Sequence, residues 1–146
     1  MKIYFDSCAI QRPLDRIDHL RMALEIEALL AIYEQIDSGA IDLVSSEPLE
    51  LELSRIAMPT RKLHALNFLA KAKEFIVVDT QIEQRARYFA SLGIKPLDAL
   101  HLACAEVSMA DYFCTCDDRL FKKARLVADL DIIVVAPLKL AEELDL

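Results

Sequence analysis

Residues Lys95 to Asp118, KPLDALHLACAEVSMADYFCTCDD, combine a buried helix and a buried strand. Pro96 suits the first turn of a helix, where its missing N–H is not needed, and Asp98 then lies near the helix's positive end. The following positions are mostly apolar, which predicts a helix that is largely buried. The residues from Tyr112 to Thr115 predict a short strand, and Asp117 lies just past its carboxyl end.

The first residues of the chain provide a second strand-end carboxylate. The apolar stretch Lys2 to Phe5 is typical of a strand and stops at Asp6. Ligands of open α/β sheets bind beyond the carboxyl ends of the strands, so Asp6 and Asp117 meet there if their strands are neighbours. Each acid taken alone could equally cap a helix or lie in a turn. Because a buried carboxylate is costly without a partner, Asp98 and the two strand-end acids together favour a cation site.

The rest of the chain alternates strand and helix patterns. Beyond the elements above, we expect strands at 41–45, 75–79 and 132–135, and helices at 15–37, from 47 onward, 60–71, 80–92, 119–126 and 137–144. Thr80 is the predicted N-cap of its helix, and Thr60 can cap another. This order predicts an α/β fold, a three-layer α/β/α sandwich with a central parallel sheet of about five strands.

Composition indicates one compact unit. The chain has 146 residues, is 55% hydrophobic and contains only two glycines, which predicts a single domain over residues 1–146 rather than a disordered chain. No stretch is apolar enough to span a membrane, and no signal peptide precedes the first strand, so we expect a cytoplasmic protein. The four cysteines match neither zinc-finger nor redox spacing and are interpreted as reduced, buried side chains.

Three short blocks together resemble the PIN domain, the metal-dependent nuclease fold of toxin ribonucleases in bacterial and archaeal toxin–antitoxin pairs. They are Ile3–Ser7, Asp98–Ala103 and Thr115–Asp117, and their order, spacing and strand–helix context match that family. The resemblance spans nearly the whole chain and implies a PIN-like fold. The sequence departs from the pattern at Cys8, where many members carry Asn, which affects a polar contact near the metal.

The resemblance also implies a set of catalytic acids. The family's other acid is a Glu on the helix after the second strand, preceded by a small hydroxyl residue. Ser46 and Glu52 fit this pattern best, while Glu47 and Glu50 remain alternatives. The implied catalytic residues are Asp6, Glu52, Asp98 and Asp117, of which Asp6, Asp98 and Asp117 bind the metal. Carboxylate oxygens suit Mg²⁺ or Mn²⁺. Asp118 is either a further ligand or, preferably, a helix cap.

Positive charge is scarce but locally grouped. A net charge of −7 excludes a general nucleic-acid binder. The acids are followed by a basic helix, and we expect Arg119, Lys122 and Lys123, with Ser7, to contact the substrate. A second basic group is Arg55, Arg61 and Lys62, and either group could instead be an ordinary solvated helix face.

The function that follows is a metal-dependent endoribonuclease, with the toxin of a toxin–antitoxin pair as its biological setting. The resemblance implies an RNA substrate, an antitoxin partner and a homodimer. The alternative is a non-catalytic PIN-like module that binds RNA or a partner protein. His101, three residues after Asp98, either orients that carboxylate, acts as a base or is a buried structural histidine. Two glycines are too few for a Rossmann or P-loop site.

Overall fold

The computed structural model describes residues 1–146 as a five-stranded sheet with helices on both faces. The strand order is β3-β2-β1-β4-β5, and every neighbouring pair is parallel. The strands are β1 (Lys2–Phe5), β2 (Asp42–Ser46), β3 (Glu74–Ile76), β4 (Tyr112–Cys114) and β5 (Ile133–Val135). The predicted parallel sheet is confirmed.

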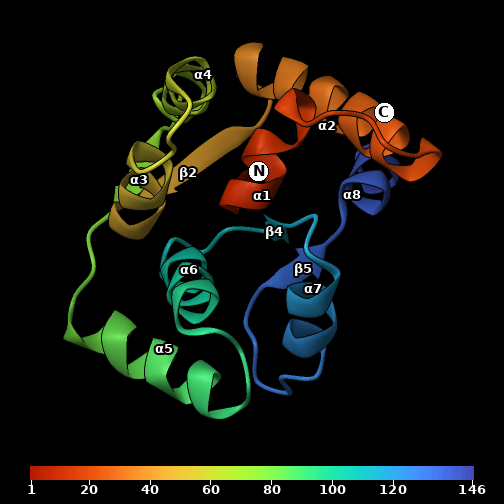
Figure 1. The fold of residues 1–146 in the computed structure, drawn as a ribbon. Coiled ribbons are helices and arrows are strands. Elements are labelled where there is room, and N and C mark those ends of the chain that lie inside the picture. Colours follow the sequence, from red (N-terminus) through yellow and green to blue (C-terminus); the bar gives the residue numbers. More distant parts are fainter.

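The helices make the outer two layers. Figure 1 shows α2, α4 and α8 on one face of the sheet and α5, α6 and α7 on the other, which confirms the three-layer α/β/α sandwich. None of the helices combines the length and apolar character needed to cross a membrane. The helices are α1 (Ser7–Gln11), the 3₁₀ helix η1 (Arg12–Leu14), α2 (Leu20–Asp37), α3 (Glu47–Ser54), α4 (Pro59–Leu69), α5 (Thr80–Ser91), α6 (Pro96–Val107), α7 (Asp118–Arg125) and α8 (Pro137–Glu143).

The central strand β1 is buried on both faces, which explains its continuous run of large apolar side chains. Tyr4 stacks on Phe113 of β4 with ring centroids 5.4 Å apart, and Phe5 meets Tyr33 of α2 edge-on at 5.7 Å. Truncating such a buried aromatic ring to Ala typically costs about 3–5 kcal/mol. These contacts fix β1 against β4 and hold the residues that follow both strands.

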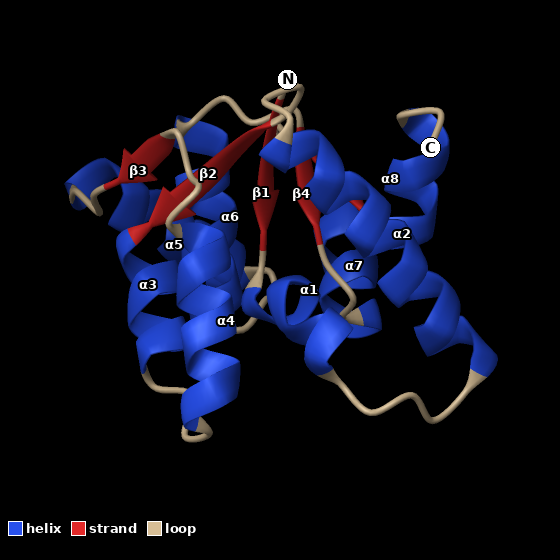
Figure 2. Cartoon of the chain, turned by 90° about the horizontal axis from the view of Figure 1, so that it is seen from above, coloured by secondary structure: helices blue, strands red, loops and turns tan.

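The strand order reverses between β1 and β4. The connection leaving β1 through α1 and α2 leads to β2 on one side, whereas β4 is reached from α5 and α6 on the opposite face (Figure 1). Figure 2 shows β1 and β4 side by side in the middle of the molecule, with α3, α4 and α6 on one side and α2, α7 and α8 on the other. In open α/β sheets the crevice at such a reversal, beyond the carboxyl ends of the strands, is where ligands bind.

Several helix starts and caps differ from expectation. The helix predicted from residue 15 begins only at Leu20, where the His19 ring accepts the N–H of Met22 at 3.2 Å. The unpredicted α1 and η1 precede it. Thr80 is not an N-cap: Asp79 accepts the N–H of Ile82 at 2.8 Å and caps α5. The helix that Thr60 was expected to cap begins at Pro59, which needs no N–H partner.

Candidate functional site

Asp6 follows β1 directly and is 4% exposed at the carboxyl end of that strand. Its Oδ1 accepts the N–H of Ala9 at 2.9 Å, so it caps α1, and its Oδ2 accepts the hydroxyl of Thr115 at 2.5 Å. Burial raises the pKa of Asp6 to about 6, although both hydrogen bonds oppose the rise, and the charge of Asp98 adds to it. Asp6 is thus a carboxylate held in one orientation at an electrostatic cost.

Asp98 lies in the first turn of α6 and is half-buried. Its carboxylate forms no hydrogen bond to the protein and no ion pair with any lysine or arginine. Partial burial raises its pKa, and the charges of Asp117 and Glu52 raise it further, while His101 and Lys95 lower it. The carboxylate of Asp98 is therefore without a partner among other negative charges.

Asp117 caps α7 with a single oxygen. Its Oδ1 accepts the N–H groups of Arg119 and Leu120 at 2.9 and 3.2 Å, and its Oδ2 has no protein partner. The N–H of Asp117 donates to the Thr115 hydroxyl at 3.0 Å, and that hydroxyl donates in turn to Asp6. Thr115 therefore joins the two strand-end acids, a link that its position two residues before Asp117 could have suggested.

Among the three glutamates considered for the fourth acid, only Glu52 reaches this site. Glu52 accepts from His101 Nε2 at 2.8 Å, and its charge contributes to the raised pKa of Asp98. Glu47 accepts the N–H of Val78 at 2.6 Å, and Glu50 lines a separate hollow beside β3. The geometry favours Glu52.

The donor set fits a hard divalent cation in its chemistry. Asp6, Asp98 and Asp117 have no lysine or arginine partner in an ion pair, and carboxylate oxygens are the ligands that Mg²⁺ and Mn²⁺ prefer. No group of three acidic, histidine or cysteine side chains is tight enough to form a ready-made metal cluster. The uncompensated negative charge attracts a cation, and the carboxylates would have to close around it.

The expected substrate-binding residues divide between two sides of α7. Arg119 and Lys123, with Lys95, line a small hollow together with Asp98 and Asp117. Lys123 also donates to the Gly93 carbonyl at 2.8 Å. Lys122 lies on the other side, where its charge lowers the pKa of Asp118. Ser7 is buried, and its hydroxyl accepts from Gln11 at 2.7 Å.

The expectation that Asp118 caps a helix is wrong, because Asp117 occupies that position. Asp118 instead pairs with Arg21 of α2 through two bonds of 2.6 and 3.0 Å. These bonds lower the pKa of Asp118 below its usual value. Asp118 therefore points away from the other acids, toward α2.

His101 is buried, as one of its interpretations required, but it does not bond to Asp98. Its Nδ1 lies 2.6 Å from the Tyr4 hydroxyl, which lies 2.6 Å from Ser46 Oγ. Tyr4 was not predicted as part of the site, since its hydroxyl cannot be distinguished in sequence from an ordinary core aromatic ring. All four cysteines are free; Cys104, Cys114 and Cys116 are buried as expected, whereas Cys8 is only partly buried.

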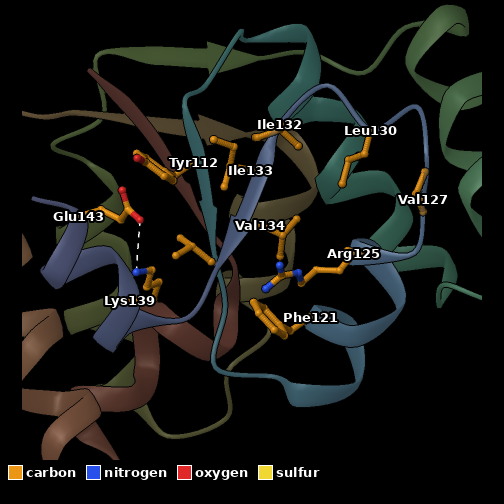
Figure 3. A pocket seen from close by; sticks show the side chains of 12 residues that line it. Tyr112, Phe121, Arg125, Val127, Leu130, Ile132, Ile133, Val134, Lys139 and Glu143 are labelled. Atoms are coloured by element: carbon orange, nitrogen blue, oxygen red, sulfur yellow. Dashed lines mark ion pairs between the residues drawn. The ribbon is translucent and has the colours of Figure 1, made fainter.

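A roomier hollow of about 350 Å³ lies elsewhere, between α7, β5 and α8 (Figure 3). Its walls are mainly apolar, with Phe121 and Val134 among them, and an ion pair between Lys139 and Glu143 stands at its rim. None of the four candidate acids lines it. The candidate acids therefore do not lie in this larger hollow.

Comparison with known proteins places this architecture. The family model of the PIN domain matches residues 3–126. The structure is similar to FitAB bound to an IR36 DNA fragment, with a TM-score of 0.55 and 19% identity over 93% of this chain and 95% of that one. It is also similar to VapBC2 from Rickettsia felis bound to a DNA fragment from its promoter, with a TM-score of 0.58 and 15% identity over 92% and 98%.

A third similar structure is PAE2754 from Pyrobaculum aerophilum, with a TM-score of 0.54 and 18% identity over 99% of this chain and 89% of that one. No curated protein sequence matches significantly. At these identities the solved structures show the fold alone, whereas the family match covers most of the chain. The chain therefore belongs to the PIN domain family, whose members are in general nucleases.

Proposed function

We propose that residues 1–146 act as a single domain that hydrolyses RNA phosphodiester bonds with a divalent metal ion. Asp6, Asp98 and Asp117 would hold Mg²⁺ or Mn²⁺, and Glu52 would complete the ring of acids. The observation that carries the proposal is the half-buried carboxylate of Asp98, which has no cationic or hydrogen-bonding partner and a raised pKa beside other acids. Such an arrangement is costly without a cation.

The chain's own residues supply the geometry for this chemistry. A bound ion would polarise the phosphodiester and activate water for in-line attack. Asp6 is oriented by Ala9 and Thr115, and the capping bonds of Asp117 leave one of its oxygens free. Burial raises the pKa values of Asp6 and Asp98, and repulsion from neighbouring acids raises them further. A bound cation would offset both effects, which favours its binding.

Phosphate contacts would come from the basic side chains beside Asp98 and Asp117. Lys95, Arg119 and Lys123 line the same hollow as these two acids, so they could hold the RNA backbone on either side of the cleaved bond. Lys122 lies toward Asp118 and would contact RNA only further along the strand. The buried hydroxyl of Ser7 would support the edge of the metal site rather than contact the backbone.

The decisive experiment is cleavage of a panel of single-stranded and structured RNAs with Mg²⁺, Mn²⁺ or EDTA. Wild type is compared with Asp98→Asn and with Asp37→Asn, a matched charge change at the end of α2, where Asp37 pairs with Lys71. We expect cleavage that requires metal, is lost in Asp98→Asn and persists in Asp37→Asn.

Metal-independent cleavage, or equal activity in both variants, would contradict the proposal. RNA binding without cleavage in wild type would instead support the alternative, a PIN-like module that binds RNA or a partner protein. The absence of a ready-made metal cluster agrees with this alternative, and the overall charge of −7 agrees with its form in which the partner is a protein.

We further propose that the protein is the toxin of a toxin–antitoxin pair and a homodimer. The support is the similarity to FitAB and VapBC2. Expression of the wild-type protein in a bacterial host should arrest growth, whereas expression of Asp98→Asn should not. Light scattering of purified Asp98→Asn should give twice the monomer mass. Equal growth with both proteins would count against the toxin role.

A further inference from the structure

Tyr4, Ser46 and His101 form a chain of hydrogen bonds inside the core that ends at Glu52. His101 is 1% exposed, and Tyr4 and Ser46 are fully buried. The bonds measure 2.6 Å between Ser46 Oγ and the Tyr4 hydroxyl, 2.6 Å from that hydroxyl to His101 Nδ1, and 2.8 Å from His101 Nε2 to Glu52 Oε1. The chain thus connects β1, β2 and α6 to the candidate catalytic glutamate on α3.

The direction of each bond follows from the carboxylate. An ionised Glu52 can only accept, so His101 Nε2 carries a proton and, in the neutral ring, Nδ1 is an acceptor. The Tyr4 hydroxyl must then donate to Nδ1, and burial keeps it protonated by raising its pKa well above the usual value. Ser46 Oγ accepts the Leu49 N–H at 3.3 Å and can donate to Tyr4. All four side chains therefore have hydrogen-bond partners when neutral His101 carries its proton on Nε2.

This arrangement restricts one end of a flexible side chain. A free glutamate loses considerable rotamer entropy when it is ordered, but here both ring nitrogens of His101 are occupied, so the ring cannot turn without losing two bonds. The bond engages only Oε1 of Glu52, and Oε2 has no protein partner. His101 follows Asp98 by three residues on α6, so its bond to Glu52 holds that carboxylate beside the turn that carries Asp98. The contribution of the Glu52 charge to the raised pKa of Asp98 agrees with this placement.

We propose that His101 is a positioning residue that acts through Glu52: held by Tyr4 and Ser46, it fixes the Glu52 carboxylate toward Asp98. This inference rests on the proposed metal-dependent activity. Residues that orient a metal-site side chain from behind commonly change metal affinity 10–100-fold when they are removed. A histidine that merely joins α6 to the sheet would act on stability, whatever residue occupies position 52.

A double-mutant cycle separates the two roles. Mn²⁺ affinity in the absence of RNA, thermal unfolding and RNA cleavage are measured for wild type, His101→Phe, Glu52→Gln and the double variant. We expect His101→Phe to weaken Mn²⁺ binding about 10-fold. In the Glu52→Gln background the same change should weaken Mn²⁺ binding no further, although it still lowers the melting temperature. Equal fold-losses in both backgrounds, or a change in melting temperature alone, would overturn the proposal.

Tyr4→Phe provides the milder variant if His101→Phe does not fold. It keeps the ring that stacks on Phe113 and removes only the hydroxyl that fixes His101. We expect weaker Mn²⁺ binding than in wild type, again only when Glu52 is present. Unchanged affinity for Mn²⁺ in Tyr4→Phe would contradict the proposed holding of His101.

The two proposals fail in different ways. If the effects of His101→Phe and Glu52→Gln on Mn²⁺ affinity are coupled but no RNA is cleaved, the nuclease proposal is wrong and the positioning role of His101 still holds. If cleavage depends on metal but the two substitutions change Mn²⁺ affinity independently, only the positioning role is wrong. If wild type bound no Mn²⁺, both would fall.

Discussion

Asp117 and Asp118 are neighbours in sequence, yet their carboxylates lie in opposite electrostatic surroundings. Asp118 is exposed and accepts two hydrogen bonds from Arg21, which lower the pKa of Asp118. Asp117 forms no ion pair with an arginine side chain, and its charge helps to raise the pKa of Asp98. The boundary between the two surroundings coincides with the first turn of α7.

The same contrast separates the crevice from the rest of the surface. Arg85 binds Glu106 and Asp129 at 2.7 and 2.9 Å, and Arg61 binds Asp15 at 2.9 Å. These ion pairs are partly exposed and neutralise their carboxylates, whereas a buried carboxylate without a cationic partner is costly. Stability alone would favour ion pairs with Asp6 and Asp98, but the nearby Lys95, Arg119 and Lys123 form none with them. The crevice therefore has the character of a site for a cation that the protein does not itself supply.

The largest expected effect is on catalysis and contrasts the two neighbours directly. Asp117→Asn should lower cleavage about 100-fold or more, because a lost metal ligand removes several kcal/mol of transition-state stabilisation. Asn still caps a helix, so α7 should remain folded. Asp118→Asn, the matched control, should change the rate by less than about threefold, as expected of a screened surface pair. Comparable losses of kcat in both variants would break the comparison.

A second prediction concerns the stability of the metal-free protein. The pKa of Asp6 is about 6 when folded, above its ordinary value of 3.8, so the folded state keeps a proton that the unfolded state has released. The free energy of unfolding should therefore fall as pH rises through this window, by about 3 kcal/mol from this group. Asp6→Asn should lack this dependence and be more stable than wild type near pH 7 in EDTA.

Chemical denaturation of both proteins between pH 4 and pH 7 measures this difference. The stability gap between Asp6→Asn and wild type should narrow toward pH 4, where folded Asp6 is protonated and the unfolded state approaches its ordinary pKa of 3.8. A gap that stays constant with pH would mean that Asp6 carries no such penalty.

The sequence predicts the positions of the candidate acids in the fold better than it predicts the residues that support them. Asp6, Asp98 and Asp117 follow from strand ends and a helix start, which are local patterns with a regular geometry. The partner of His101, Tyr4, lies 97 residues away along the chain, and no spacing rule connects them. Which glutamate faces the site likewise depended on the packing of α3 against α6.

The fold was predictable to a similar degree. The alternation of apolar strands and helices identified the layers, because parallel strands buried on both faces have a distinctive composition. The start of α2 was placed too early, since the apolar period alone does not reveal that Arg61 binds Gln11, Asp15 and the Leu14 carbonyl. These long-range bonds hold the preceding segment in a non-helical path.

Metal binding should offset the electrostatic cost of keeping the carboxylates of the crevice ionised. At pH 7.5, Mg²⁺ at about 100 times its Kd should stabilise wild type by about 2.7 kcal/mol. The gain should be smaller below pH 6, where protons compete for Asp6, and should be largely absent in Asp98→Asn. Thermal unfolding with Mg²⁺ and EDTA checks this, with Asp118→Asn as the control that keeps the response. Equal stabilisation of Asp98→Asn and wild type would place the ion elsewhere.

The smallest expected effect lies on the other side of the boundary. Removing the Arg21–Asp118 pair should cost only about 0–1 kcal/mol, because both side chains are more than half exposed and solvent screens their attraction. A double-mutant cycle with Arg21→Ala and Asp118→Asn, read by denaturant unfolding at low and high salt, measures this coupling. Arg21 also lies 3.7 Å from buried Glu25, so Arg21→Ala alone should cost more than Asp118→Asn. A coupling free energy well above 1 kcal/mol that is insensitive to salt would contradict the view that the Arg21–Asp118 pair contributes little to stability.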